Sequence, residues 1–324
     1  MKKVSGLMLT CMIFTALVVF IAGCSPTTSG AVRDDTTLTE TSKELATMSD
    51  VSQYKGPKLR VGVVNFQNRT PSRVLGIGES AADILGTILQ KTGRFIVIPQ
   101  QDMQSILSQQ RMGATGAINP DTAAKMGQIM GLNAIVTGAI TAYSEAEEGS
   151  AFGVGGSKKQ IARVTVDYRL VDTTTGVQLL ADSGAGIYEK KATTVLGIGS
   201  KASYDTDLRD GALRDALTKA MVNMMKQLGN RKWSGRIAEV SGTTLYINAG
   251  QKSGLNVGDK LDVYRAGKEI IDPETKQKLG TIEDLIGSLV VIRNDLGAQM
   301  DLSVAQATTG MGFKPGDIVK LSSK

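Results

Sequence analysis

The placement of its two cysteines constrains what this 324-residue sequence can fold into. Both lie in the first 24 residues, at Cys11 and Cys24, behind a pair of lysines and around an apolar stretch at 7–20. That stretch has the length of the apolar part of a signal peptide and is shorter than the roughly 20 residues of a membrane-spanning helix. We therefore predict that residues 1–23 are removed on export. Because no cysteine follows Cys24, the exported chain has to fold without a disulfide bond.

The residues at the predicted cleavage point, Ile21-Ala22-Gly23-Cys24, resemble the lipobox of bacterial lipoproteins. The resemblance implies that the Cys24 sulfur carries a diacylglycerol group and that its α-amine is acylated, which would anchor the chain to a membrane. Lipoproteins that are retained at the inner membrane resemble one another in having Asp directly after the acylated cysteine. This chain has Ser25 at that position, so the implied location is the outer membrane, mainly facing the periplasm. The alternative is an ordinary secretory signal in which Cys24 is incidental.

The composition argues against several classes of function. The chain has no histidine, and no thiol would remain free after lipidation, so the commonest general base and the commonest metal ligands are missing. We therefore expect no enzyme activity, no catalytic residues, no metal and no cofactor. The formal charge of +6 is spread without a cluster and aromatic residues make up only 4% of the chain, so we expect no nucleic-acid partner.

The exported chain divides into three segments. Residues 24–57 are polar and rich in Ser and Thr, and we interpret them as a lipidated tether. Residues 58–230 alternate β-rich and helical patterns, which predicts an α/β layer domain. Residues 233–324 contain short strands separated by closely spaced glycines, which predicts a small all-β barrel. The expected fold class is thus α+β, an α/β layer domain with β-hairpin extensions followed by a small barrel.

Hydrophobic periodicity places the elements of the first domain. Alternating apolar residues from Val164 to Leu170 predict a strand buried on one face, and the turn at 172–176 leads to a returning strand. Apolar residues at helical spacing from Leu208 to Leu228 predict a long amphipathic helix that closes the domain. The earlier elements are strands at 59–66, 94–98 and 133–143, with helices at 79–91, after Pro99 and after Asn119.

Short motifs in the first domain resemble the CsgG/HfaB family, the lipoproteins of curli production and holdfast attachment. They are Val63-Val64-Asn65-Phe66-Gln67-Asn68-Arg69-Thr70, Val136-Thr137-Gly138-Ala139-Ile140 and Arg169-Leu170-Val171-Asp172-Thr173-Thr174-Thr175-Gly176. The resemblance implies a homo-oligomeric ring and a role in assembling or exporting surface fibres, whose subunits would be partners. Residues 235–322 resemble the C-terminal domain of the flagellar assembly protein FlgT, through Gly254-Leu255-Asn256-Val257-Gly258-Asp259 and Lys314-Pro315-Gly316-Asp317.

Channel members of this family send two β-hairpins per subunit into a multi-subunit membrane barrel. The corresponding segments here are 143–161 and 181–204, and both contain several Glu and Lys residues. Neither segment has the continuous apolar alternation that a lipid-facing strand of about 9 to 11 residues needs. These residues favour hairpins that are too short and too charged to insert. The alternative to a transport or assembly component is therefore a lipid-tethered periplasmic scaffold without channel activity, serving an envelope or flagellar complex.

Two apolar, glycine-rich tips remain at the hairpin positions. The first includes Phe152 and Val154, and the second includes Val195, Leu196 and Ile198. One interpretation is that these tips touch the bilayer surface or a neighbouring subunit. The other is that they are a pair of flexible loops.

Overall fold

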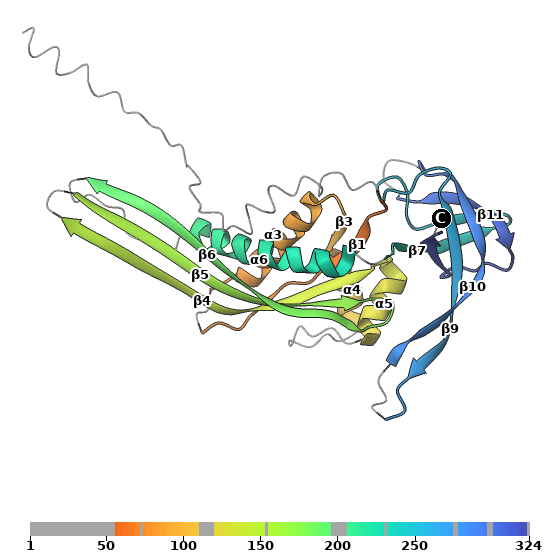
Figure 1. Cartoon of the computed structure of the whole chain (residues 1–324), viewed down its shortest axis with the longest axis horizontal. Helices are drawn as coiled ribbons and strands as arrows, with labels where there is room; N and C mark the ends of the chain where they lie inside the picture. The colour runs from red at the N-terminus through yellow and green to blue at the C-terminus, as the bar shows by residue number, and fades with distance from the viewer. Residues whose placement is uncertain are drawn as a thin grey trace, which may run out of the picture. The chain divides into compact units, whose positions relative to one another are not determined.

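The computed structural model describes residues 56–71, 74–109, 120–152, 155–195, 206–229, 232–274, 278–296 and 301–322. They all belong to one compact unit, Thr37–Lys324. The predicted signal peptide, the lipidation site and nearly all of the tether lie outside these residues. What is described is a mixed sheet with its helices, followed by a closed barrel (Figure 1).

The first sheet has the strand order β3-β1-β4-β5-β6, with the short β2 paired to β4. β1 runs parallel to β3 and to β4, whereas β4, β5 and β6 are antiparallel neighbours. The strand bounds are β1 Leu59–Val63, β2 Gln67–Asn68, β3 Phe95–Pro99, β4 Ala134–Phe152, β5 Gly155–Asp172 and β6 Gln178–Val195. The parallel half contains the predicted β–α alternation, and the antiparallel half contains the predicted period-2 strand.

Helices cover both faces of this sheet. α3 (Ile77–Lys91) and α6 (Thr206–Gly229) pack on one face, in a core that includes Val136 and Leu170. The adjacent residues Ile135 and Val171 belong to a second core, which includes residues of α4 (Gln100–Gln109) and α5 (Pro120–Met130). Neighbouring residues of a strand point to opposite faces, so the two cores lie on opposite sides of the sheet.

The C-terminal strands close into a barrel with the order β10-β11-β8-β7-β12-β9, and every neighbouring pair is antiparallel. The predicted α+β fold class is confirmed, including the barrel. The strands are β7 Ser234–Ser241, β8 Thr244–Ile247, β9 Lys260–Ile271, β10 Lys278–Arg293, β11 Ser303–Gly310 and β12 Ile318–Leu321. Buried aliphatic side chains fill the interior, among them Ile237, Ile247, Leu261, Val263, Leu289, Val291 and Val319.

Polar contacts join the barrel to the first domain. The Asn133 side chain accepts the Arg60 backbone N–H (2.8 Å) and donates to the Ser234 carbonyl (2.9 Å). The start of the described chain is also held here, because the Lys58 N–H donates to the Ser253 carbonyl at 2.7 Å. The N-terminal flank of β1 therefore depends on the domain that is last in the sequence.

Candidate functional site

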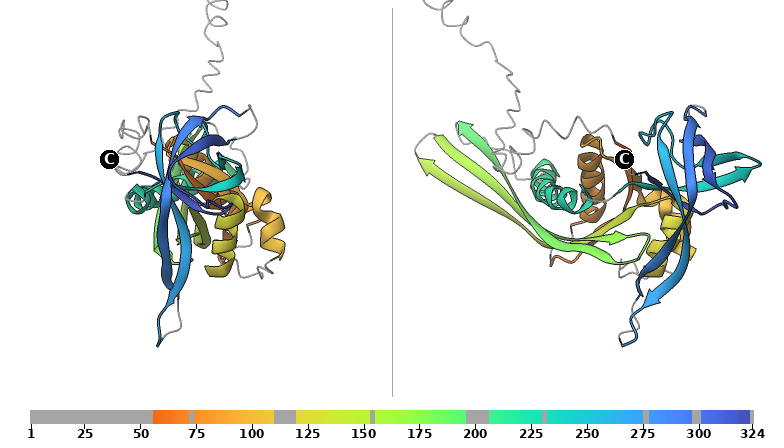
Figure 2. Two further views of the ribbon diagram at one scale, coloured as in Figure 1. Left: turned by 90° about the vertical axis from the view of Figure 1, so that its right-hand side faces the viewer. Right: turned by 45° about the vertical axis from the view of Figure 1, so that its right-hand side comes forward.

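The most distinctive feature of the first domain is an extension of its sheet. β4, β5 and β6 run side by side past the beginning of α6 (Figures 1 and 2). We call residues 146–152, 155–161 and 189–195 the distal arm, because the register pairs these three segments with one another along their whole length. At about 3.3 Å per residue the arm extends the sheet by roughly 23 Å.

The arm brings the two predicted tips together. Phe152 ends β4 and Val195 ends β6, and both are paired with Gly155, the first residue of β5. The backbone therefore places these two positions at the same end of the sheet, on the two strands that flank β5. Val154, Leu196 and Ile198 lie outside the described residues, as does Cys24.

The strands are longer than the sequence predicted. We expected the strand that begins at Asn133 to end at Tyr143, yet β4 continues to Phe152, and β5 begins at Gly155, nine residues before the expected alternation. Some of the charged residues that argued for short hairpins pair across strands. Lys159 of β5 and Glu189 of β6, for example, form an ion pair at 2.9 Å.

α6 covers part of the outer edge of β6. The Asp215 carboxylate accepts the Ile187 backbone N–H (3.1 Å), and the Lys219 ammonium donates to the Ala185 carbonyl (2.7 Å). Asp215 and Lys219 also pair with each other at 2.9 Å. Occupying the backbone groups of an edge strand prevents its pairing with another chain. Among the described strands none pairs with this edge of β6 at 189–195.

Other segments cover the first part of the outer edge of β4. β1 pairs with Ala134 to Val136, β2 pairs with Ala139 and Ile140, and the Arg69 N–H donates to the Ile140 carbonyl (2.9 Å). From Thr141 onward, no other strand in the described part of the chain pairs with this edge. Within the described ranges, the distal arm thus presents two strand edges, one on β4 and one on β6, with which no further strand pairs.

Close helix packing fixes where the arm begins. A Cβ atom at Gly186 of β6 would lie 2.1 Å from the Ala212 carbonyl oxygen, and one at Gly184 would lie 2.5 Å from the Ala216 carbonyl oxygen. The α6 backbone can approach β6 so closely only because these positions lack side chains. The sequence analysis did not identify this contact. The sequence pattern that accompanies this contact is a pair of glycines two residues apart in a strand, together with Ala212, Ala216 and Ala220 at helical spacing.

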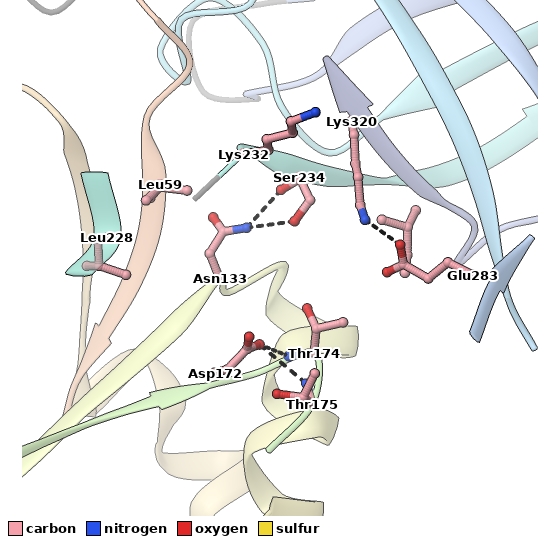
Figure 3. A pocket seen from close by; sticks show the side chains of 11 residues that line it. Leu59, Asn133, Asp172, Thr174, Thr175, Leu228, Lys232, Ser234, Glu283 and Lys320 are labelled. Atoms are coloured by element: carbon pink, nitrogen blue, oxygen red, sulfur yellow. Dashed lines mark hydrogen bonds and ion pairs between the residues drawn. The ribbon is translucent and has the colours of Figure 1, made fainter. Parts of the chain in front are cut away.

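A polar pocket of about 240 Å³ lies where the two domains meet (Figure 3). Several of its polar side chains are already engaged: Asn133 donates to Ser234, Lys320 pairs with Glu283, and Asp172 accepts the N–H groups of its own turn. The sequence analysis did not predict this pocket. Its lining is Leu59, Asn133, Asp172, Thr174, Thr175, Leu228, Lys232, Ser234, Glu283, Ile318 and Lys320.

The electrostatics of the sheet fit a structural role. Burial raises the pKa of Tyr168 to about 12, an effect to which the negative charge of Asp182 adds, and the Tyr168 hydroxyl donates to Asp182 (3.2 Å). The pKa of Asp182 is lowered, chiefly because it accepts the Ser183 N–H.

Within the described ranges no three His, Cys, Asp or Glu residues are grouped so that they could hold a metal ion. None of the helices described here is long and apolar enough to cross a membrane.

Comparison with known proteins relates most of the chain to one family. Residues 42–254 match the family described as curli production assembly/transport component CsgG. A protein of Neisseria meningitidis serogroup B, named as lipoprotein NMB1126/NMB1164, is 28% identical over 247 residues, which cover 72% of this chain and 98% of that protein. The family match continues past the predicted domain boundary and includes β7 and β8 of the barrel.

Two solved structures are similar at lower identity. Lipoprotein GNA1162 from Neisseria meningitidis is 19% identical with a TM-score of 0.31, covering 52% of this chain and 98% of its own. A PelC dodecamer from Paraburkholderia phytofirmans is 15% identical with a TM-score of 0.28, covering 52% of this chain and 88% of its own. The likeness of residues 235–322 to FlgT is supported by none of these matches and stays a prediction.

Proposed function

We propose, because the chain belongs to the CsgG family, that it is a lipid-anchored outer-membrane protein which associates with copies of itself to assemble or export surface fibres. The observation that carries this proposal is the distal arm, whose two outer edges pair with no further strand among the residues that the structure describes. An uncovered strand edge is a ready template for pairing with another chain. A protein that keeps two of them on one arm can take a neighbour on each side.

The proposed anchor is the acylated Cys24. Two or three acyl chains attach a protein to a membrane far more firmly than one chain does. Residues 24–57 would then act as the tether between the lipid and the folded domains, which would face mainly the periplasm. The membrane and further copies of this chain are thus the first partners of the protein, and fibre subunits or other envelope proteins would follow.

A second function is favoured by the charges on the arm. Glu147, Glu148, Lys159 and Lys190 all lie within its strands, where a lipid-facing surface would need apolar side chains. This observation favours a lipid-tethered periplasmic scaffold for an envelope or flagellar complex, without channel activity. The C-terminal barrel would then be the part available for binding other envelope proteins.

Replacement of the predicted lipid acceptor tests the anchor. Cys24→Ser is expected to release the protein from the membrane fraction into the periplasm, because the acyl chains would be its firm attachment. Cys11→Ser is the matched control, since Cys11 would leave with the signal peptide and its loss should not alter anchoring. A Cys24→Ser protein that still fractionates as an integral membrane protein would contradict the proposal.

The mass of the detergent-extracted native particle tests self-association. A mass of several subunits is expected, whereas a monomer would refute the proposed assembly. Conductance in planar bilayers then separates the two functions, because a channel component would conduct and a tethered scaffold would not.

A further inference from the structure

The pocket at the domain joint contains polar groups that the fold itself does not use. Thr174, in the turn after β5, and Lys232, two residues before β7, both line it. Within the described part of the chain, neither the Thr174 hydroxyl nor the Lys232 ammonium has a hydrogen-bond or ion-pair partner. The Ser234 hydroxyl accepts an N–H of the Asn133 side chain (3.1 Å) and can still donate its own proton. The unused groups are therefore chiefly donors.

Positive charge exceeds negative charge around these donors. Lys320 pairs with Glu283, and its ammonium, which has three N–H groups, keeps donors for a further acceptor. Glu283 also attracts a second cation: burial lowers the pKa of Arg236, and the charge of Glu283 opposes this effect. The Asp172 carboxylate accepts two N–H groups of its own turn, at 2.6 and 3.3 Å. Because both carboxylates are engaged, the charges around the pocket favour an anion.

The unused groups lie on two sides of the pocket. Figure 3 shows Lys232 and Lys320 on the side of the barrel, and Thr174 opposite them on the first domain. The Lys232 ammonium points away from Thr174 in this view, and its flexible stem allows it to turn toward an anion. An anion between these side chains would be held by both domains.

Apolar side chains form another part of the lining. Leu59, Leu228 and Ile318 are each at most 9% exposed. The pocket volume of about 240 Å³ is below the roughly 300 to 1,000 Å³ of sites for drug-sized ligands, so it suits a smaller molecule. The ligand that fits this lining combines one anionic group with a short aliphatic body.

The kind of anion follows from the donors. Phosphate groups are typically cradled by several backbone N–H groups, and those of this turn already bind Asp172. A carboxylate has two oxygens, which an ammonium and a hydroxyl can satisfy. We propose that the pocket binds a carboxylate on a short aliphatic body, either a small acid or the C-terminal residue of a peptide. This site goes beyond the proposed function and does not depend on it.

Ligand binding to the full-length lipidated protein in detergent tests the proposal. Trp233, the single tryptophan of the chain, directly follows Lys232 and is 5% exposed, so its fluorescence reports on the pocket. N-Acetyl-leucine, which has about twelve non-hydrogen atoms, is expected to bind with a dissociation constant on the order of 1 mM. N-Acetyl-leucinamide has the same shape without the charge and is expected to bind about tenfold more weakly.

The midpoint of urea unfolding provides a second measurement that does not rely on fluorescence. A ligand that binds only the folded chain stabilises it, so N-acetyl-leucine should raise this midpoint. The same concentration of sodium chloride controls for ionic strength, and N-acetyl-leucinamide controls for the aliphatic body.

Two substitutions test the assigned groups. Thr174→Val removes the hydroxyl and keeps the shape of the side chain, so it should weaken binding of N-acetyl-leucine about tenfold. Thr174→Ser, which keeps the hydroxyl, is the matched control. Lys232→Gln should weaken binding about threefold, since an exposed ion pair contributes less. Lys268→Gln, at an exposed lysine of β9 outside the pocket lining, should leave binding unchanged.

A short peptide that ends in a free leucine carboxylate distinguishes the two sources of the ligand. If it binds at least as tightly as N-acetyl-leucine, the site takes the end of a polypeptide chain. If only N-acetyl-leucine binds, the site takes a small acid. Either result supports a carboxylate site.

Several results would overturn the proposal. Equal affinity for the acid and the amide would do so, as would tighter binding of inorganic phosphate than of N-acetyl-leucine. So would the absence of any change in fluorescence and in the unfolding midpoint with about 100 mM acid, relative to sodium chloride. Unchanged affinity in both Thr174→Val and Lys232→Gln would refute the site. None of these measurements depends on self-association, so the proposed function stands or fails separately.

Discussion

Gly186→Ala should displace α6 from the sheet at the base of the distal arm. The new Cβ would lie 2.1 Å from the Ala212 carbonyl oxygen and 2.5 Å from the Ala216 backbone nitrogen. An ordinary carbon–oxygen contact is about 3.3 Å, so the helix would have to move by about 1.2 Å. Both obstructing atoms belong to the backbone, which no side-chain rotation can relieve.

The expected cost follows from overpacking. Extra atoms in a packed core destabilise by about 1 to 3 kcal/mol, and here the strain exceeds the roughly 0.4 to 1 kcal/mol that loss of a glycine contributes through the unfolded chain. We therefore expect Gly186→Ala to lower the free energy of unfolding by about 1 to 3 kcal/mol. The shift would also move Asp215 and Lys219, which cap the edge of β6.

Urea unfolding followed by far-ultraviolet circular dichroism measures this loss. Gly280→Ala in β10 is the matched control, because a Cβ there meets no atom within 4 Å. It should be neutral or slightly stabilising. If Gly186→Ala were as stable as Gly280→Ala, the close approach of α6 to β6 would not be a constraint on the fold.

Two further predictions concern the domain joint and pH. Asn133→Ala removes the side chain that bonds the Arg60 N–H and the Ser234 carbonyl, which should lower the free energy of unfolding by about 1 to 3 kcal/mol and accelerate tryptic cleavage after Lys232. Asn256→Ala, in an exposed turn, is the control. Equal cleavage rates in the two variants would contradict the role of Asn133. Tyr168 has a pKa of about 12 in the fold, above the value of about 10 in an unfolded chain, so its contribution to stability is complete below pH 10 and is lost as the pH rises from 10 through 12. Burial raises the pKa of Tyr143 even further, so a spectrophotometric titration at 295 nm should show late steps from two tyrosines. Tyr168→Phe should remove the earlier of these two late steps, and a loss of amplitude near pH 10 instead would refute the burial of the Tyr168 hydroxyl.

The sequence predicted those elements whose signal is local. α6 was expected from Leu208 to Leu228 and runs from Thr206 to Gly229, because its apolar residues repeat at helical spacing. The barrel was expected from its turn glycines and short strands. Each pattern is complete within one segment, so no knowledge of distant residues was needed.

The β-hairpin extensions were predicted, but the length of their strands was not, because the stabilising contacts of the distal arm join distant residues. Lys159 argues against a strand when read alone, and its partner Glu189 is 30 positions away. Likewise, nothing in the residues around Phe152 indicates that Val195 lies one strand beyond Gly155. The register creates these relationships, and the register depends on the whole sheet.

The contact between Lys58 and Ser253 has a consequence for the order in which the molecule folds. A chain that emerges from its N-terminus presents β1 early, yet the hydrogen bond that holds the flank of β1 needs a residue 195 positions later. Gly254, at φ +83°, also packs beside the Gly56 carbonyl, so a second contact of this flank joins residues that are far apart in the sequence. Closing contacts of such long sequence separation is slow. β1 should therefore be among the last strands described here to acquire its final surroundings, although it is made early.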